Sequence, residues 1–494
     1  AALRMGQRDV TGKKGTSDAV CLFCLYPKAE SGILYIVNKC ERAVRYRQMG
    51  VKMAEVRPFR AWRPAQGLAE RIAALPYDVV NGKEAREETR REPFSFLAVD
   101  RPETQFEEED ADVTEERVYE RAGTLLRQWM KEGSLQQEAE PCYYIYELER
   151  LGHVQTGIAA CVSVDDYLNG VIRRHENTRS DKEEDRTRHV KACEAQTGPV
   201  FLAYRAAKAV EAVTERCRRE ACLYDFVSPD GITHRVWRIG RKEDIRAVHV
   251  AFEKVERLYI ADGHHRCASA VRVAKECRRK CPDYTGKEPF NFILSVLFPD
   301  DQLTILEYNR VVRDLNGLTP QEFLQKVGEV FEITPMEEPY RPERKGMFGL
   351  YLEKKWYRLS RKPENGEKYE KTEASGDGSQ KSDPARALDV AVLQRLILEP
   401  VLGITDPRTD ERIDFVGGIR GLQELEKRCD QDCAAAFSLY PTSIGELFSV
   451  ADAGLLMPPK STWFEPKLRS GLFIHSLKDE NDVPADMLHS EERN

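Results

Sequence analysis

The residues with the clearest chemical potential lie in the stretch LYIADGHHRCASAV, residues 258–271. An apolar run precedes its Asp-Gly pair and a helical pattern follows, so the stretch predicts a strand, a turn and a helix N-terminus. Asp262 can cap this helix, and Gly263 lets the backbone turn and approach a ligand closely. His264, His265 and Arg266 are then expected to project from the first helical turn.

Cationic side chains in a first helical turn oppose the helix dipole, and they gain stability there when an anion joins them. The unpaired N–H groups of that turn also bind anions, so the junction predicts a phosphate or carboxylate ligand. Arg266 can hold phosphate oxygens in a fork, and a histidine beside it can donate a hydrogen bond or move a proton near neutral pH. Two alternatives stay open, namely a capped helix whose histidines satisfy local carbonyls and a zinc site with further ligands.

A second group of chemical residues lies in the charged stretch 172–190. Glu176 could serve as a general base for a substrate hydroxyl. Asp181 and Asp185 are weaker candidates for holding magnesium. The candidates for phosphate binding are Arg173, Arg174, Lys182 and Arg186. The alternative is a solvated helix with salt bridges, but the non-helical start HENTRSD after an apolar strand end favours a functional role.

A third group lies in the proline-stiffened loop 457–467, MPPKSTWFEPK. Lys460 offers a cation and Ser461 and Thr462 offer hydroxyl groups to an anionic ligand. The upstream glycines of a P-loop are missing, so these residues do not form that motif. A rigid surface loop before a strand is the alternative interpretation.

The elements that must position these residues are predicted from hydrophobic periodicity. A strand at 256–261, a helix at 264–281 and a strand at 290–298 are expected to form a β-α-β unit, with 303–312 turning back as a hairpin. Earlier in the chain, 142–148 and 155–162 are predicted as paired strands. Further strands are expected at 199–205 and 235–239. Helices are expected at 83–92 and 115–132, after Asp383-Pro384, and after the capping box Ser443–Glu446. The predicted fold class is α/β, a mixed sheet with flanking helices.

The length of 494 residues predicts several domains or one large domain with elaborations. Residues 1–52, with the lone pair Cys21 and Cys24, are expected to be an extension before a folded protein that begins at Met53. An N-terminal α/β region is predicted at 53–150, a central nucleotide-binding α/β region at 151–330 and a C-terminal region at 331–494. The last region contains a polar loop at 363–384.

Composition narrows the classes of function. The net charge of −7 argues against a general nucleic-acid binder, and no apolar run reaches the length of a membrane span. The thirteen cysteines include Cys267, Cys277 and Cys281 within one helical pattern, which is typical of reduced thiols in a cytosolic protein. No feature of the sequence sets the oligomeric state.

From Met53 to about Leu477 the chain resembles a widespread prokaryotic family known as domain of unknown function 1015. The matching landmarks are MAEVRPFRAW, LPYDVV, HENTR, QTGPVF, YIADGHHR and MPPKSTWFEPK. The junction Asp262–Arg266 also resembles the nucleotide-phosphate motif of the ParB/sulfiredoxin-like superfamily. Sulfiredoxins carry their nucleophilic cysteine where this chain has His264, and ParB proteins add a helix-turn-helix domain that is absent from this sequence pattern.

The resemblance to free-serine kinases of this superfamily, which share the Asp-Gly-His-x-Arg form, implies a small-molecule kinase. It implies ATP or ADP with Mg²⁺ as cofactors, free L-serine as the leading acceptor and an upstream glutamate, here Glu176, acting on the hydroxyl. His264, His265 and Arg266 would hold the phosphates, and Lys182, Arg186 and Lys460 would neutralise their charge. A nucleotide-binding regulatory protein without turnover and a phosphotransferase or hydrolase for another metabolite remain alternatives.

Overall fold

The computed structural model describes residues 53–107, 114–362 and 383–478. Every described residue belongs to one compact unit, which begins at Met53. The predicted extension 1–52 therefore lies outside the described residues, as does most of the predicted polar loop 363–384. No helix in the described ranges has both the length and the apolar character that a membrane crossing requires.

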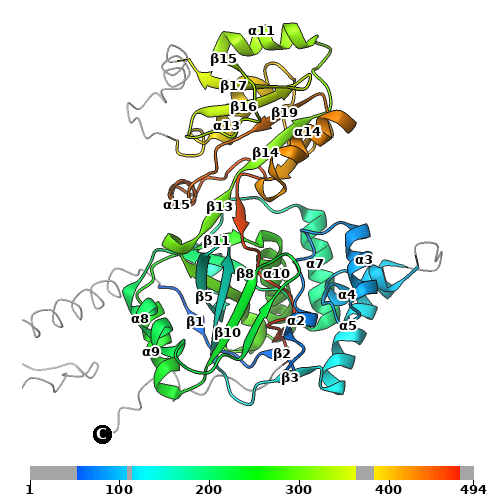
Figure 1. The fold of residues 1–494 in the computed structure, drawn as a ribbon. Coiled ribbons are helices and arrows are strands. Elements are labelled where there is room, and N and C mark those ends of the chain that lie inside the picture. Colours follow the sequence, from blue (N-terminus) through cyan, green and yellow to red (C-terminus); the bar gives the residue numbers. More distant parts are fainter. Residues whose placement is uncertain (1–52, 108–113, 363–382, 479–494) are drawn as a thin grey trace, which may run out of the picture. The chain divides into compact units, whose positions relative to one another are not determined.

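A nine-stranded mixed sheet forms the larger of the two main sheets (Figure 1). Eight strands follow the order β6-β11-β8-β12-β5-β4-β10-β9, and β1 pairs with β5 beside them. The sheet is mixed because β12 runs parallel to β8 and antiparallel to β5. Its strands are β1 (Val56–Arg57), β4 (Tyr143–Arg150), β5 (His153–Ser163), β6 (Ile172–Arg173), β8 (Val200–Tyr204), β9 (Tyr224–Val227), β10 (Thr233–Ile239), β11 (Leu258–Asp262) and β12 (Phe292–Pro299).

Both faces of the large sheet are covered, which explains why its central strands are apolar at nearly every position. Along β4, Tyr143 and Ile145 belong to one buried cluster, whereas Tyr144 and Tyr146 belong to another. The first cluster contains residues of four helices, α6 (Val164–Leu168), α8 (Lys208–Cys217), α9 (Lys242–Phe252) and α10 (His264–Lys280). Fully burying one large apolar side chain contributes roughly 1.5–3 kcal/mol, so burial on both faces stabilises the sheet that carries the site.

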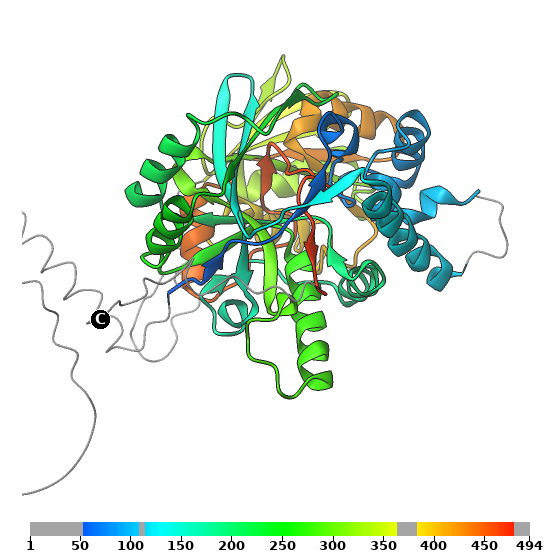
Figure 2. The ribbon, with the colours of Figure 1, turned by 90° about the horizontal axis from the view of Figure 1, so that it is seen from below.

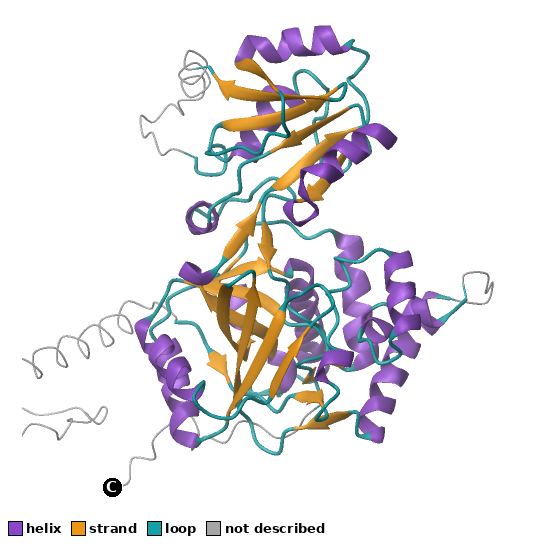
Figure 3. Cartoon of the chain, in the orientation of Figure 1, coloured by secondary structure: helices purple, strands orange, loops and turns teal. Residues whose placement is uncertain are grey.

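Helices flank the sheets (Figure 3). Both ribbon views show α8 and α9 side by side on one flank of the large sheet (Figure 2). On another flank lie α3 (Gly82–Arg91), α4 (Leu97–Asp100) and α5 (Glu115–Glu132). The other described helices are α2 (Ala69–Ile72), α7 (Ser180–Cys193), α11 (Pro320–Val330), α13 (Asp389–Leu393), α14 (Gly421–Gln431) and α15 (Ile444–Asp452). The short helical turns are η1 (Pro102–Gln105), η2 (Pro289–Asn291), η3 (Asp300–Gln302), η4 (Gln394–Leu398) and η5 (Gly418–Arg420).

A second sheet has six strands in the order β15-β17-β16-β19-β14-β18, all paired antiparallel. Its strands are β14 (Tyr308–Val312), β15 (Phe331–Met336), β16 (Met347–Leu352), β17 (Lys355–Arg361), β18 (Ile413–Gly417) and β19 (Ala435–Ser438). Three two-stranded ladders complete the pairing, formed by β2 (Trp62–Pro64), β3 (Leu135–Gln137), β7 (Ala195–Gln196), β13 (Thr304–Leu306), β20 (Trp463–Glu465) and β21 (His475–Ser476). Two of these ladders, β13-β20 and β21-β7, join the last described segment to earlier parts of the chain.

The mixed α/β fold class is confirmed, and so are most of the predicted elements around the site. The predicted strand pair 142–148 and 155–162 corresponds to β4 and β5, which form a hairpin. The predicted domain boundary at 150 falls at the end of β4, within this hairpin. The predicted helix 115–132 has the bounds of α5, and the capping box at Ser443 opens α15.

Two predicted connections are wrong. The strands on either side of α10, β11 and β12, run antiparallel to each other with β8 between them, so they form no β-α-β unit. The expected hairpin between 290–298 and 303–312 is absent too. Segment 303–312 is split into β13, which pairs with β20, and β14, which enters the second sheet. Hydrophobic pattern identifies strands but not their partners, which distant segments decide.

Two smaller predictions are also wrong. Asp383 does not open a helix, because its carboxylate accepts from the N–H groups of Ala385 and Arg386 in a local turn, and α13 begins at Asp389. Cys267 is buried as expected, but Cys277 is only partly buried and Cys281 is exposed, because the end of α10 leaves the core.

Candidate functional site

The predicted strand-turn-helix junction is present between β11 and α10. Gly263 adopts φ 91° and ψ 34°, a left-handed conformation that glycine reaches without steric cost, and α10 begins at the next residue. The predicted capping role of Asp262 is wrong, because no side chain caps α10. The Asp262 Oδ1 atom instead accepts from the Gly263 N–H at 2.8 Å. The first turn of α10 therefore keeps backbone N–H groups without a side-chain cap.

A lysine from the last described segment holds Asp262 in place. The Lys467 Nζ atom donates to Asp262 Oδ2 at 3.0 Å, and the Arg266 Nη2 atom lies 3.9 Å from the same oxygen. Burial would raise the pKa of Asp262, but Lys467 and Arg266 outweigh burial and hold that pKa well below its usual range. Asp262 is therefore a carboxylate at neutral pH, and its charge is already matched by two cations.

Three neighbouring side chains at the start of α10 carry buried nitrogen atoms without a hydrogen-bond partner among the described residues. These atoms are His264 Nε2, His265 Nδ1 and Arg266 Nε. The other end of the Arg266 guanidinium donates through Nη1 to the Pro199 carbonyl, which fixes its direction. A buried polar group left unpaired costs about 1–3 kcal/mol, so three at one helix start fit a site that a polar ligand completes.

His264 faces two residues of the segment that follows β6. The rings of His175 and His264 meet edge to face, with centroids 4.6 Å apart, and the Glu176 Oε2 atom lies 4.0 Å from His264 Nδ1. Burial lowers the pKa of His264 to about 4 and that of His175 to about 3. Both imidazoles are therefore neutral at pH 7, and the Glu176–His264 contact is not an ion pair.

Lys460 lies in the electrostatic field of the same groups. Burial would lower its pKa, but Tyr308, Glu176, Asp78 and Asp262 outweigh burial and raise it to about 12. Lys460 itself adopts φ 54°, an uncommon conformation for a residue other than glycine. The Met457 N–H donates to the His175 carbonyl at 2.8 Å, which ties the 457–467 loop to the HENTR segment.

Arg310 of β14 is a buried cation that the sequence prediction missed. Its Nη2 atom donates to the Pro459 carbonyl at 3.1 Å, directly before Lys460. Burial lowers its pKa to about 10, although Tyr308 and Glu176 oppose the shift. Its position within an apolar strand gave no local signal, because a charged residue there is equally typical of an exposed strand face.

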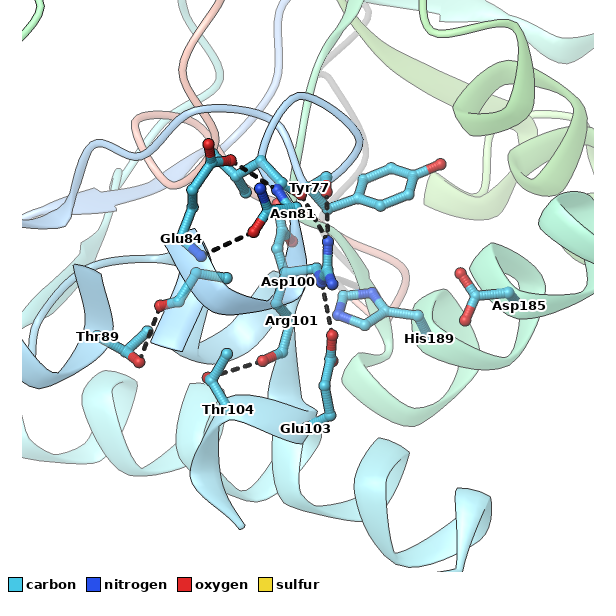
Figure 4. Close-up of polar contacts among 12 residues, drawn as sticks. Tyr77, Asn81, Glu84, Thr89, Asp100, Arg101, Glu103, Thr104, Asp185 and His189 are labelled. Carbon is cyan, nitrogen blue, oxygen red and sulfur yellow. Dashed lines mark hydrogen bonds and ion pairs between the residues drawn. The ribbon is translucent and has the colours of Figure 1, made fainter. Parts of the chain in front are cut away.

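Residues 75–80, with the sequence LPYDVV, form one wall of the site. Arg101 Nη1 donates to the carbonyls of Tyr77 and Val80 at 3.0 and 2.9 Å, and this contact holds the loop (Figure 4). The Tyr77 ring lies under the Arg186 guanidinium, with 4.0 Å from Cζ to the ring centroid. Tyr77, Arg186 and Arg266 line a common cavity of about 30 Å³, which has room for a water molecule.

Of the two α7 residues predicted to bind phosphates, Arg186 lies beside the junction and Lys182 does not contact it among the described residues. Arg186 reaches the cavity beside Arg266, but it is buried and bonds to Asp185 and the Asp100 carbonyl. Lys182 is exposed on α7, and no contact of its side chain with the junction is found. The structure thus joins Glu176, Lys460 and the 262–266 junction in one neighbourhood, and Arg186 borders it.

The two carboxylates predicted to hold magnesium do not fit that role. Asp181 is exposed and engaged by Arg179 at 2.9 Å, while Asp185 accepts from the Tyr119 hydroxyl at 2.7 Å and from Arg186. Within the described ranges, no group of three or more His, Cys, Asp or Glu side chains is arranged to hold a metal ion. Among the residues that the structure describes, the histidine pair thus lacks the further ligands that a zinc site requires.

The fold and the junction define an α/β protein with a polar site at a strand-helix junction. Residues 56–391 match the family described as "Protein of unknown function (DUF1015)", and the chain belongs to that family. No curated protein matches the chain.

Three solved structures are similar to parts of this chain. A free serine kinase in complex with AMP is 15% identical, with 64% of this chain and 92% of that chain covered and a TM-score of 0.30. SbnI with C-terminal truncation from Staphylococcus aureus is 12% identical, with 65% and 90% covered and a TM-score of 0.33. A conserved hypothetical protein from Pyrococcus furiosus is 14% identical, with 64% and 94% covered and a TM-score of 0.29.

Proposed function

We propose that this protein is a small-molecule kinase that transfers a phosphoryl group from ATP or ADP to a free hydroxyl metabolite. The observation that carries the proposal is the first turn of α10, where uncapped N–H groups adjoin three buried, unpartnered side-chain nitrogens. A phosphate group is a polyvalent acceptor that can satisfy several such donors at once. L-serine is the leading acceptor because Asp262–Arg266 has the form that free-serine kinases share.

The roles of the side chains follow from their positions. Arg266 and the N–H groups of α10 would bind the donor phosphates, and Lys460 would offset the charge on the transferring oxygens. Glu176 would accept the proton of the acceptor hydroxyl. At the same time the hydroxyl oxygen would bond to the transferred phosphorus, and the bond between that phosphorus and the leaving phosphate would break. His264 is neutral at pH 7, so it would serve as a hydrogen-bonding group and not as a fixed charge.

Magnesium remains part of the proposal as a companion of the nucleotide, since phosphoryl transfer generally relies on it. Asp181 and Asp185 are not its ligands in this proposal, because both are engaged by other groups of the chain. When bound, the metal would supply charge neutralisation at the phosphate oxygens.

The test offers ATP or ADP separately, with magnesium, to the full chain together with a panel of free amino acids and hydroxyl metabolites. Mass spectrometry follows phosphorylated product. O-phosphoserine is the expected product, and product from another acceptor would keep the mechanism and change the substrate. Nucleotide binding without product from any acceptor would contradict the kinase proposal and favour the regulatory alternative.

The phosphate site is tested separately by Arg266→Ala, which should weaken nucleotide binding by about 2–4 kcal/mol. The matched control is Arg279→Ala, which removes the same charge from an exposed position near the end of α10. Unchanged nucleotide affinity in folded Arg266→Ala protein would remove Arg266 from the phosphate site. Calorimetric titration with ADP gives both affinities.

A further inference from the structure

A second, larger cavity lies at the edge of the nine-stranded sheet, where β6 and β11 pair. Its volume is about 500 Å³, within the range of small-molecule sites. Tyr259 of β11 and Arg173 of β6 are direct partners in the strand register, and both line it. None of the residues of the nucleotide junction, 262–266, lines this cavity.

The cavity is lined by an excess of positive charge. Four cationic side chains contribute, namely Arg173, Arg205, Lys254 and Arg257, against two acidic side chains, Glu256 and Asp452. The carboxylate of Asp452 is already occupied, since it accepts from the Tyr259 hydroxyl at 2.9 Å and from Arg205 Nη2 at 2.6 Å. The remaining cations therefore face the space with little opposing charge.

The hydrogen bonds of these cations are incomplete. The Arg173 Nε atom is buried and has no partner among the described residues. Within the described ranges, the Arg257 side chain makes one long hydrogen bond, from Nη1 to the Gly170 carbonyl at 3.4 Å. By contrast, Arg205 is fixed in place, because it stacks on Phe448 with 4.8 Å from Cζ to the ring centroid. The site thus has a rigid wall and two guanidinium groups with free donor capacity.

We infer that this cavity binds a small phosphate monoester, separately from the nucleotide. A phosphate monoester carries between one and a half and two negative charges near pH 7, which matches an excess of about two positive charges. Guanidinium forks bind such a group through paired N–H donors, and the burial of Arg173 Nε places one donor out of water. This inference goes beyond the proposed kinase activity and does not depend on it.

The binding test uses the full chain and glycerol 3-phosphate as the probe, with affinity measured by calorimetric titration. The double variant Arg173→Gln/Arg257→Gln should weaken probe binding by about tenfold or more, because each change removes charge-assisted bonds. The same variant should keep its affinity for ADP. The matched control Arg279→Gln removes an exposed arginine elsewhere and should change neither affinity.

Two further variants keep the outcome clear. Lys254→Gln alters an exposed lysine, so it leaves folding intact, and it should weaken probe binding by a few fold. Arg266→Ala should leave probe binding unchanged. Probe binding that is lost in Arg266→Ala protein but kept in the double variant would overturn the inference, and so would the absence of probe binding to the unmodified chain.

Discussion

At the residue scale, the candidate site combines neutral histidines, cations and two carboxylates, of which Asp262 is paired with Lys467 and Glu176 faces His264. Burial gives His264 and His175 pKa values of about 4 and 3, while Lys460 keeps its charge because its pKa is raised to about 12. A neutral imidazole can accept or donate a hydrogen bond without competing with lysine or arginine for an anion. The arrangement thus separates the groups that bind charge from the group that can move a proton, Glu176.

The role of Glu176 can be tested by Glu176→Gln, which keeps the size of the side chain and removes its basicity. We expect nearly normal nucleotide affinity and a chemical rate lower by about a hundredfold or more. Single-turnover kinetics measures that rate. Glu184→Gln is the control, because Glu184 lies on α7 and pairs with Arg188 and Arg272. A fully active Glu176→Gln enzyme would exclude Glu176 as the base.

At the element scale, the junction between β11 and α10 depends on one backbone conformation. A Cβ atom added at Gly263 would lie 3.0 Å from Arg266 Nε and 3.1 Å from Cζ. The left-handed conformation that starts α10 and the position of the Arg266 guanidinium are therefore linked. This link explains why a glycine and an arginine three residues apart act together in the sequence motif.

Gly263→Ala should lower the free energy of unfolding by about 1–2 kcal/mol through backbone strain and should also weaken ADP binding by displacing Arg266. The control is Gly231→Ala, since Gly231 has a similar φ of 77° and no atom within 4 Å of the added Cβ. It should show the strain without the binding defect. Equal ADP affinity in the two variants would contradict the link. Denaturant unfolding and calorimetric titration measure the two effects.

The sequence predicted the elements of the site better than their partners. The strand, glycine turn and helix at 258–281 are local features, and the structure contains all three. The role of Asp262 depended on Lys467, which lies 205 positions away, so a capping role was predicted in place of a salt bridge. Arg310 and the antiparallel order of β11 and β12 likewise depend on pairings between distant segments, which periodicity does not encode.

At the scale of the whole molecule, several buried histidines make stability depend on pH. Burial lowers the pKa of His175 and His234 to about 3 and that of His264 and His475 to about 4. The unfolded chain, with histidine pKa values near 6.5, binds these protons first. Their contribution to stability is therefore complete above about pH 6.5 and is lost as the pH falls toward 4.

The free energy of unfolding should fall by about 1.4 kcal/mol per pH unit for each such histidine between about pH 6 and pH 4.5. Urea unfolding at a series of pH values measures this slope. His475→Gln should lower this slope by about 1.4 kcal/mol per pH unit, the share of one proton, because the His475 side chain is buried and its Nε2 atom bonds to the Pro289 carbonyl. An unchanged slope in that variant would show that His475 does not contribute.

The contacts between the 457–467 loop and earlier segments can form only late in synthesis, because the loop lies near the end of the chain. A ribosome that has reached residue 450 has already delivered Glu176, Asp262 and Arg266, but neither Lys460 nor Lys467. Until those lysines emerge, the contact from Met457 to the His175 carbonyl and the pair between Lys467 and Asp262 are both missing. In an unfinished chain Asp262 therefore has Arg266 but not Lys467 as a charge partner, and the ligand site is completed only late in synthesis.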